Sequence, residues 1–259
     1  MKLFDTHSHM YLDAFDDDRE ACMRRAEEAG VAMTALPNID ATTIPALNAM
    51  MEAYPGKVIG MMGLHPSSVG AGYEADLEVI GEALESGGYH AVGEIGIDLY
   101  WDKTFAEEQT AAFRRQIGWA KAKNLPIVIH MRESFENVCK VLESEYEPGL
   151  KGVFHCFTGS ESEARRALEF PGFYLGIGGV VTFKNSDLGE VLKQVGPDRL
   201  VLETDAPYLA PHPYRGKRNE TAYTALVAEK LSQVFGCTVD EVARITTANA
   251  CDLFNLETI

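Results

Sequence analysis

The chain has 259 residues, 46% of them hydrophobic, and a formal net charge of −16. Such a charge excludes a protein that coats a long stretch of nucleic acid, because neutralising many phosphates needs clustered lysine and arginine; it is compatible with an enzyme that grips one strand end locally. No apolar run approaches the roughly 20 residues of a membrane-spanning helix, and no basic and apolar signal segment opens the chain. The five cysteines are scattered without C-x-x-C spacing, as in proteins of a reducing compartment. We expect a cytoplasmic protein without membrane contact, and no protein partner is predicted.

Short apolar runs predict eight strands whose starts lie 22 to 35 residues apart, the length of one strand–helix unit of a parallel sheet. The runs cover residues 3–7, 31–37, 58–65, 91–95, 126–130, 151–157, 173–177 and 200–204. Amphipathic stretches between them predict helices at residues 16–29, 105–123, 161–169, 187–195 and 222–235. After Cys237 we expect two further helices. Thr238 is placed to cap the first, with Glu241 three residues on, and the second covers residues 247–254.

Eight strand–helix units in a chain of this length predict a (β/α)₈ TIM barrel, which we expect to occupy residues 1–259 as a single domain. The alternative is a doubly wound open sheet, which more usually has about five to seven strands and a glycine-rich loop after the first strand. Gly176, Gly178 and Gly179 do not follow the first predicted strand, so they are weak support for a nucleotide-binding fold. No linker or composition break divides the chain.

Histidines and carboxylates gather at the carboxyl ends of the predicted strands, where barrel enzymes carry their chemistry. His7 and His9 end the first strand and point to the same side, because residues two apart on a strand share a face. Alone, this pair would be equally typical of a solvent-exposed N-terminus. However, five of the seven histidines lie at strand ends, which satisfied core histidines do not explain. The residues at these ends are His7, His9, His65, Glu94, His130, His155, Glu203 and Asp205.

Neutral imidazoles combined with carboxylates favour a divalent metal centre, and their distribution over the strands favours two ions. His7, His9 and Asp205 come from the first and last strands, which are neighbours in a closed barrel, and are predicted to hold one ion. His130 and His155 come from adjacent strands and are predicted to hold the second. A centre with a single ion is the main alternative.

Three carboxylates have different expected roles. Glu94 is predicted to bridge both ions through its two oxygens. Asp205 is expected to be a ligand, the general base towards water, or both, so Asp205 and Glu94 are the predicted catalytic residues. Glu203 lies two residues before Asp205 and is predicted to orient a ligand histidine, with a buried salt bridge as the alternative.

The positive residues near this centre favour an anionic phosphate ester as substrate. Arg132 follows His130 by two residues and is expected to point towards the same opening. Arg215 and Lys217, with Arg218, form the one dense basic cluster, in the loop after the last strand, and phosphate sites in barrels often lie there. For Arg218 alone we favour an exposed, solvated side chain.

An aromatic pair, Tyr100 and Trp101, follows the fourth strand at the open face of the barrel. These rings are placed either to stack on a nucleobase or to pack over the barrel opening, and the sequence does not favour one over the other. Asp98, just before them, is expected to belong to the hydrogen-bonded surroundings of the centre.

Six motifs occur in chain order at the strand ends: Asp5-Thr6-His7-Ser8-His9, Gly63-Leu64-His65-Pro66, Gly93-Glu94-Ile95-Gly96-Ile97-Asp98, His130-Met131-Arg132, His155-Cys156-Phe157 and Glu203-Thr204-Asp205-Ala206-Pro207-Tyr208. Each is weak alone, but the ordered set is specific and covers essentially the whole chain. Together they resemble the TatD-type metal-dependent hydrolases, deoxyribonucleases of the wider amidohydrolase-like barrel group. One departure is Thr221, where this family usually has proline; it affects how the next helix starts.

The resemblance implies an amidohydrolase-like (β/α)₈ barrel, a divalent metal centre, and hydrolysis of phosphodiester bonds in DNA, often from the 3′ end of single strands. It also implies that His65 and Arg132 contact the phosphate. The metal ligands that it implies are His7, His9, Glu94, His130, His155 and Asp205.

Two other functions remain as alternatives from the sequence. One is hydrolysis of an amide or acyl ester in the same barrel, including deacylation of an aminoacyl-RNA; many amide-cleaving relatives bridge their metals with a carboxylated lysine, and Glu94 speaks mildly against that. The other is a metal-binding protein without turnover. The expected cofactor is two divalent ions: imidazole ligands favour zinc or manganese, while carboxylates and phosphate substrates admit magnesium. The expected partner is DNA, contacted locally at single-stranded ends, with the cleavage polarity left open.

Overall fold

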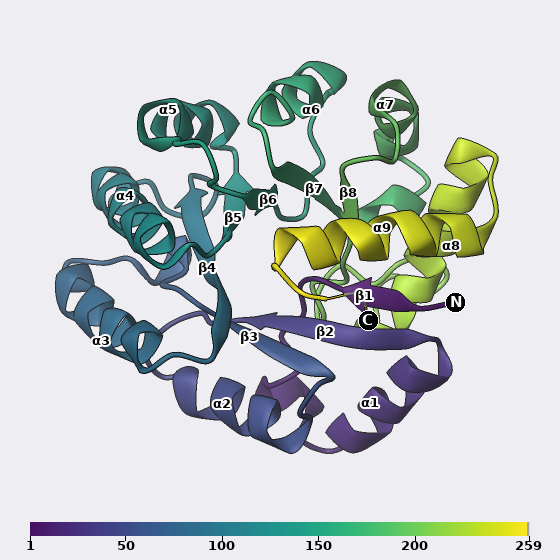
Figure 1. Ribbon diagram of the computed structural model, residues 1–259, viewed down its shortest axis with the longest axis horizontal. Coiled ribbons are helices and arrows are strands. Elements are labelled where there is room, and N and C mark those ends of the chain that lie inside the picture. The colour runs from purple at the N-terminus through teal and green to yellow at the C-terminus, as the bar shows by residue number, and fades with distance from the viewer. Residues whose placement is uncertain (258) are drawn as a thin grey trace.

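Eight parallel strands follow one another in chain order around a nearly closed barrel, and helices alternate with them on the outside (Figure 1). The computed structural model describes residues 1–257 and 259. The strands are β1 (Leu3–Asp5), β2 (Val31–Pro37), β3 (Val58–Met62), β4 (Tyr89–Asp98), β5 (Ile127–Arg132), β6 (Gly152–Phe154), β7 (Phe173–Ile177) and β8 (Leu200–Leu202). The helices are α1 (Arg19–Glu28), α2 (Ile44–Ala53), α3 (Tyr73–Ser86), α4 (Ala106–Lys123), α5 (Phe135–Glu145), α6 (Glu161–Ala167), α7 (Leu188–Val195), α8 (Thr224–Phe235) and α9 (Val239–Leu253). The predicted (β/α)₈ TIM barrel is confirmed.

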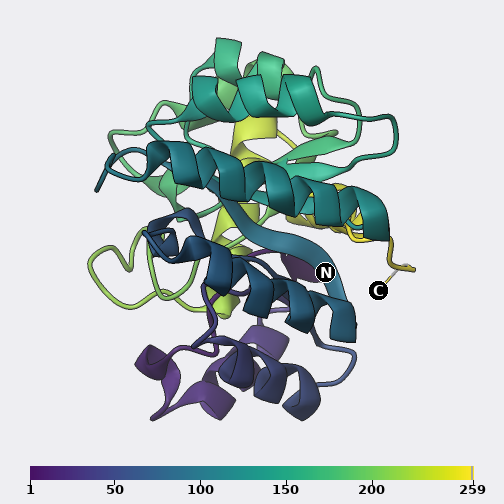
Figure 2. The same ribbon diagram turned by 90° about the vertical axis from the view of Figure 1, so that its left-hand side faces the viewer.

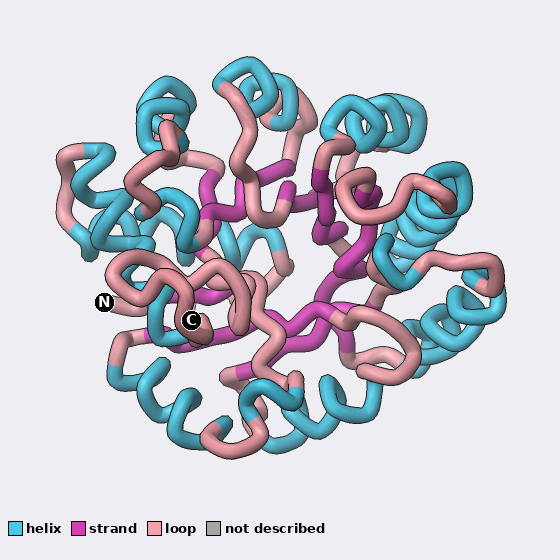
Figure 3. The backbone as a smooth tube through the Cα atoms, turned by 180° about the vertical axis from the view of Figure 1, so that it is seen from behind, coloured by secondary structure: helices cyan, strands magenta, loops and turns pink. Residues whose placement is uncertain are grey.

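A buried apolar cluster fills one end of the barrel interior. Every strand contributes at least one inward side chain to it: Phe4, Met33, Ile59, Ala91, Val128, Val153, Tyr174 and Val201. Ala250, Leu253 and Phe254, from the end of α9, complete this cluster, and the rings of Phe254 and Phe4 stack with centroids 5.5 Å apart. Helix α9 crosses this end of the barrel, whereas loops lie across the opposite end, which faces the viewer when the molecule is seen from behind (Figures 1 and 3). Polar chemistry is therefore confined to the loop-covered end.

The second apolar layer lies between the strands and the surrounding helices. On α4, Phe113, Ile117 and Ala120 recur at helical spacing and are fully buried. Helices α3, α4 and α5 lie side by side over this part of the barrel (Figure 2). Because the strands are covered on both faces, their sequences read as continuous apolar runs. Of the helices in the described part of the chain, none combines the length and apolar character of a membrane span.

The prediction of two helices after Cys237 is wrong, because a single helix, α9, covers Val239–Leu253. Its predicted cap is present: the Thr238 side chain accepts a hydrogen bond from the backbone N–H of Glu241 at 3.2 Å. The β-branched residues in the middle do not break the helix. Thr246 donates its hydroxyl to the Val242 carbonyl one turn earlier at 2.8 Å, so its polar atom is satisfied within the helix.

Strands β4 and β5 extend further than predicted, and this changes where two site residues lie. Glu94 and His130 are inside these strands rather than at their ends. The two strands pair through residues 95–98 and 129–132, beyond an irregularity between Val92 and Ile95. Gly96 permits this pairing, because a Cβ there would lie 2.0 Å from the carbonyl oxygen of His130.

The barrel closes between β1 and β8 through backbone and side chains just beyond the strands. Backbone N–H groups of Thr6 and His9 donate to the carbonyls of Leu202 and Ala206, at 2.9 and 2.7 Å. The buried carboxylate of Asp5 accepts from the backbone N–H of Thr204 at 2.9 Å and from its hydroxyl at 2.7 Å. This closing seam carries the His7–His9 segment and Asp205.

Thr204→Val should destabilise the protein, because it leaves the buried Asp5 carboxylate with one fewer donor. We expect the free energy of unfolding to fall by about 1–3 kcal/mol, measured by urea denaturation. Thr246→Val is the matched control: it is also a buried threonine, but it loses only a bond within its own helix. Equal losses in the two variants would contradict a special role for the Asp5–Thr204 contact.

Candidate metal centre

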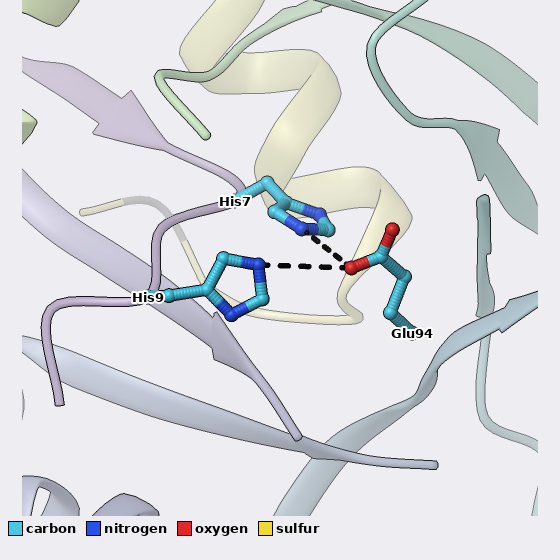
Figure 4. Close-up of side chains that lie close together, drawn as sticks. All are labelled: His7, His9 and Glu94. Carbon is cyan, nitrogen blue, oxygen red and sulfur yellow. Dashed lines mark hydrogen bonds and ion pairs between the residues drawn. The ribbon is translucent and has the colours of Figure 1, made fainter. Parts of the chain in front are cut away.

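Glu94, from β4, is buried at the centre of the site. Its Oε2 atom lies 3.1 Å from Nε2 of His7 and 3.7 Å from Nε2 of His9, both in the segment after β1 (Figure 4). Its Oε1 atom faces a different pair, 2.9 Å from Nδ1 of His130 and 3.8 Å from Nε2 of His155. Each carboxylate oxygen therefore faces one of the two histidine groups that the sequence assigned to separate ions.

Asp205, beyond β8, connects the two groups. Its Oδ1 atom lies 3.6 Å from Nε2 of His9, 3.8 Å from Nε2 of His155 and 3.9 Å from Nε2 of His7. The backbone of Asp205 has φ +58°, a left-handed conformation that is unfavourable for most side chains and frequent at functional sites. The structure thus brings all six residues predicted as metal ligands together.

The outer nitrogens of two of these histidines are hydrogen-bonded to the protein. Nδ1 of His9 lies 3.1 Å from the hydroxyl of Tyr11, which donates its own proton to the Pro37 carbonyl at 2.6 Å and so accepts from His9. Nε2 of His130 donates to Oδ2 of Asp98 at 2.8 Å. Such bonds fix which nitrogen carries a proton and turn the lone pair of the other towards a metal. Sequence reasoning missed Tyr11, although its spacing of two residues from His9 would have placed it on the same side.

His155 is held in the same way by Glu203, the contact that the sequence predicted for this carboxylate. Its Nδ1 donates to Oε2 of Glu203 at 3.0 Å, and the backbone N–H of Cys156 donates to Oε1 at 2.7 Å. Gly176 makes room for this arrangement, because a Cβ there would lie 2.2 Å from Oε2 of Glu203. The glycine-rich run that begins inside β7 therefore accommodates a carboxylate.

His65 presents a donor rather than a lone pair to the centre. Its Nδ1 accepts from the backbone N–H of Ser67 at 3.1 Å, so the proton sits on Nε2. This Nε2 lies 3.4 Å from Oε1 of Glu94 and 3.2 Å from Nδ1 of His130. An N–H that faces the centre suits contact with an anionic group better than metal ligation.

Burial keeps most of the imidazoles neutral. It lowers the pKa of His7 and His155 and holds the pKa of His9 well below the ordinary value. The His7 and His155 rings stack with centroids 3.4 Å apart, and Nδ1 of His7 is buried without a hydrogen-bond partner. Neutral imidazole is the form that ligates a metal.

Among the described residues, no lysine or arginine forms an ion pair with the carboxylates of Glu94, Glu203 or Asp205. Burial raises the pKa of both Asp205 and Glu203 to about 7. Burial would also raise the pKa of Glu94, but the surrounding histidines hold it well below its usual range. For His130, burial would lower the pKa, yet hydrogen bonds to Asp98 and Glu94 raise it to about 9, so without a metal a proton also occupies Nδ1, the nitrogen that faces the centre. These donors fit divalent cations, which would supply the missing charge.

The predicted basic residues are placed differently from one another. Arg132, at the end of β5, stacks on Tyr100, with its guanidinium carbon 3.8 Å from the ring centroid. Arg215 lies 3.7 Å over the ring of Phe183, and neither Arg215 nor Lys217 makes an ion pair or hydrogen bond to the centre within the described residues. The expectation of a solvated side chain is wrong for Arg218, which pairs with Asp18 at 2.7 Å across the loop.

Residues 4–255 match the family model described as TatD related DNase. The chain belongs to the TatD family. It is 41% identical to the uncharacterized metal-dependent hydrolase YabD of Bacillus subtilis, over 98% of this chain and 99% of that protein. It is 30% identical to a protein named 3′-5′ ssDNA/RNA exonuclease TatD, from Erwinia tasmaniensis, over 98% of this chain and 100% of that protein. This protein is thus a metal-dependent hydrolase of the TatD family.

Solved structures agree with this assignment. The crystal structure of YjjV, a TatD homologue from Escherichia coli K12, superposes with a TM-score of 0.91 at 31% identity and 98% coverage of both chains. A lactonase from Deinococcus radiodurans superposes with a TM-score of 0.70 at 16% identity, over 97% of this chain and 95% of that chain, which shows the shared barrel fold alone.

The raised pKa of Asp205 predicts a pH dependence of stability in the metal-free TatD protein. Because the folded-state pKa of about 7 lies above the ordinary value of 3.8, the folded protein binds the extra proton, and stability falls as pH rises between these values. Between about pH 5 and pH 8, the free energy of unfolding of Asp205→Asn should therefore fall less than that of the wild type. It is measured by urea denaturation in the presence of a chelator. Asp198→Asn, at an exposed aspartate, is the control. A wild-type pH slope in Asp205→Asn would contradict the assignment.

Proposed function

We propose that this TatD protein hydrolyses phosphodiester bonds of DNA, as a 3′–5′ exonuclease on single strands, with two divalent ions at the carboxyl end of its barrel. The ions would be zinc, magnesium or manganese. The residues proposed to hold them are His7, His9, Glu94, His130, His155 and Asp205. The observation that carries the proposal is the division of the Glu94 carboxylate, with Oε2 towards His7 and His9 and Oε1 towards His130 and His155.

Two divalent ions held by these residues would lower the pKa of a bound water and neutralise charge on the phosphate. Asp205, whose Oδ1 reaches histidines of both groups, accepts the proton of the attacking water. His65 donates its Nε2–H to a phosphate oxygen, and Arg132 adds a positive charge beside it. Arg215 and Lys217, on the exposed loop after β8, contact the strand further from the centre.

Two observations favour a nucleic acid over a neutral amide or ester. Within the described residues, Arg132 has no carboxylate partner, so its charge is available to an anionic substrate. Two relatives, at 30% and 31% identity, are named as 3′-5′ ssDNA/RNA exonucleases. Hydrolysis of a neutral amide or ester would leave the positive charge of Arg132 without a counterpart.

The two-ion arrangement predicts a change in metal content. The double variant His130→Ala, His155→Ala should bind about one equivalent fewer metal than the wild type while keeping its circular-dichroism spectrum, because the ligands around His7 and His9 are untouched. Metal is measured by elemental analysis after dialysis. Unchanged stoichiometry in a folded double variant would show that a single ion accounts for the centre.

Asp205→Asn tests the general base. This change keeps the shape of the side chain but removes its proton-accepting power, so single-turnover cleavage of an end-labelled single-stranded oligonucleotide should slow by roughly a thousandfold. Glu203→Gln, which alters only the partner of His155, should slow cleavage by ~10–100-fold. Metal is measured on the same preparations. Near-normal cleavage by Asp205→Asn would falsify the mechanism, and absence of cleavage by the wild type would overturn the nuclease proposal.

A further inference from the structure

Tyr100 and Trp101 form an exposed aromatic surface beside the metal centre. They lie just after β4, with relative exposures of 47% and 73%, and Trp101 is the most exposed large hydrophobic side chain among the described residues. The two rings pack edge to face, with centroids 4.7 Å apart. The exposure of both rings favours stacking on a nucleobase over packing across the barrel opening, the two placements that the sequence left open. Aromatic side chains left in water at a functional opening are typical of binding surfaces.

The loop that carries these rings is held in place by the surroundings of the centre. Oδ1 of Asp98 accepts from the backbone N–H groups of Tyr100 and Trp101, at 3.0 and 3.4 Å. Its other oxygen accepts from Nε2 of His130 at 2.8 Å. A single carboxylate thus connects a proposed metal ligand to the aromatic pair. The loop backbone is therefore held beside the centre without a ligand, which lowers the entropic cost of binding.

Arg132 completes this surface. Its guanidinium carbon lies 3.8 Å from the ring centroid of Tyr100 and 5.1 Å from that of Trp101. The backbone carbonyl of Arg132 also accepts from Leu99 at 2.9 Å, which ties the end of β5 to the same loop. A guanidinium stacked on a ring keeps its N–H donors in its own plane, where they remain available to phosphate oxygens.

An aromatic face beside a fixed cation matches the two halves of a nucleotide. A nucleobase stacks on the exposed ring of Trp101, and the adjoining phosphate binds the guanidinium of Arg132. Stacking requires an open face of the base, which a base inside a duplex lacks because its neighbours cover both faces, whereas an unpaired base can turn a face to the protein. The overall charge of −16 makes such a local cation the expected anchor for an anionic strand.

We propose that Tyr100, Trp101 and Arg132 form a stacking subsite that holds one unpaired nucleobase of a nucleic-acid strand next to the phosphodiester at the metal centre. This inference rests on the proposed nuclease function and defines how its substrate is chosen. The subsite accepts any base, because every base has a flat face, and it favours purines for their larger area.

The chain offers a direct probe, because it contains only two tryptophans, Trp101 and Trp119. Trp119 is on α4, where it packs against Gly81 of α3 and Arg115, away from the opening. In a Trp119→Phe protein the fluorescence reports Trp101 alone. We expect quenching when a phosphorothioate-linked single-stranded oligonucleotide binds. An oligonucleotide with abasic residues at its last three positions should bind, by anisotropy of a 5′ dye, without this quenching.

Kinetics provide the second readout. Trp101→Ala should raise KM for single-stranded DNA by roughly 5- to 150-fold, with kcat little changed, because the ring contacts a base rather than the reacting atoms. Trp101→Phe should keep most of the affinity, since phenylalanine also stacks. The loss in Trp101→Ala should shrink when the substrate carries abasic residues at the 3′ end.

The outcomes separate the subsite from the function. Cleavage by the wild type without Trp101 quenching, or with an unchanged KM in Trp101→Ala, overturns the subsite and leaves the nuclease proposal standing. Quenching and base-dependent binding without cleavage support the subsite and overturn the nuclease proposal. If oligonucleotides neither bind nor are cleaved, both are wrong.

Discussion

A buried carboxylate surrounded by imidazoles is the interaction on which the rest of this molecule depends. Burying the charge of Glu94 is expensive unless positive or polar groups face it, and histidines from four places in the chain do so. They hold the pKa of Glu94 low, while the neighbouring carboxyls of Asp205 and Glu203 have a raised pKa and lack fixed cations. The site therefore contains more acidic oxygen than the protein itself neutralises, which is the electrostatic condition for binding divalent metal.

The two ends of the barrel have different roles: one end holds the apolar core, and the other holds the polar centre. Inward apolar side chains from every strand and the end of α9 fill one end, so the polar centre at the other end does not have to hold the core together. The seam between β1 and β8 is the exception. The backbone that closes the barrel there also positions His7, His9 and Asp205, and the Asp5–Thr204 contact stabilises both. Weakening this seam should therefore destabilise the fold and, at the same time, displace the residues proposed as metal ligands.

Polar side chains behind the histidines orient the imidazole rings of the centre. Tyr11, Asp98 and Glu203 each accept from one ring nitrogen, which turns the lone pair of the other nitrogen inward. Asp98 does more, because it also holds the backbone of the loop that carries Tyr100 and Trp101. The proposed recognition of an unpaired base is thereby built onto the same carboxylate that orients a proposed ligand.

The sequence by itself determined the barrel and the members of the candidate centre. Strand–helix spacing repeats along the chain, and parallel strands bring their carboxyl ends to one place, so histidines far apart in sequence had to meet. Only the tertiary structure decided the position of Glu94 inside β4, the single helix α9, and the pairing of Arg218 with Asp18, two hundred residues away. It also decided which nitrogen of each histidine faces inward. These features depend on contacts between distant segments, and no local spacing of residue types encodes which oxygen a given side chain will meet.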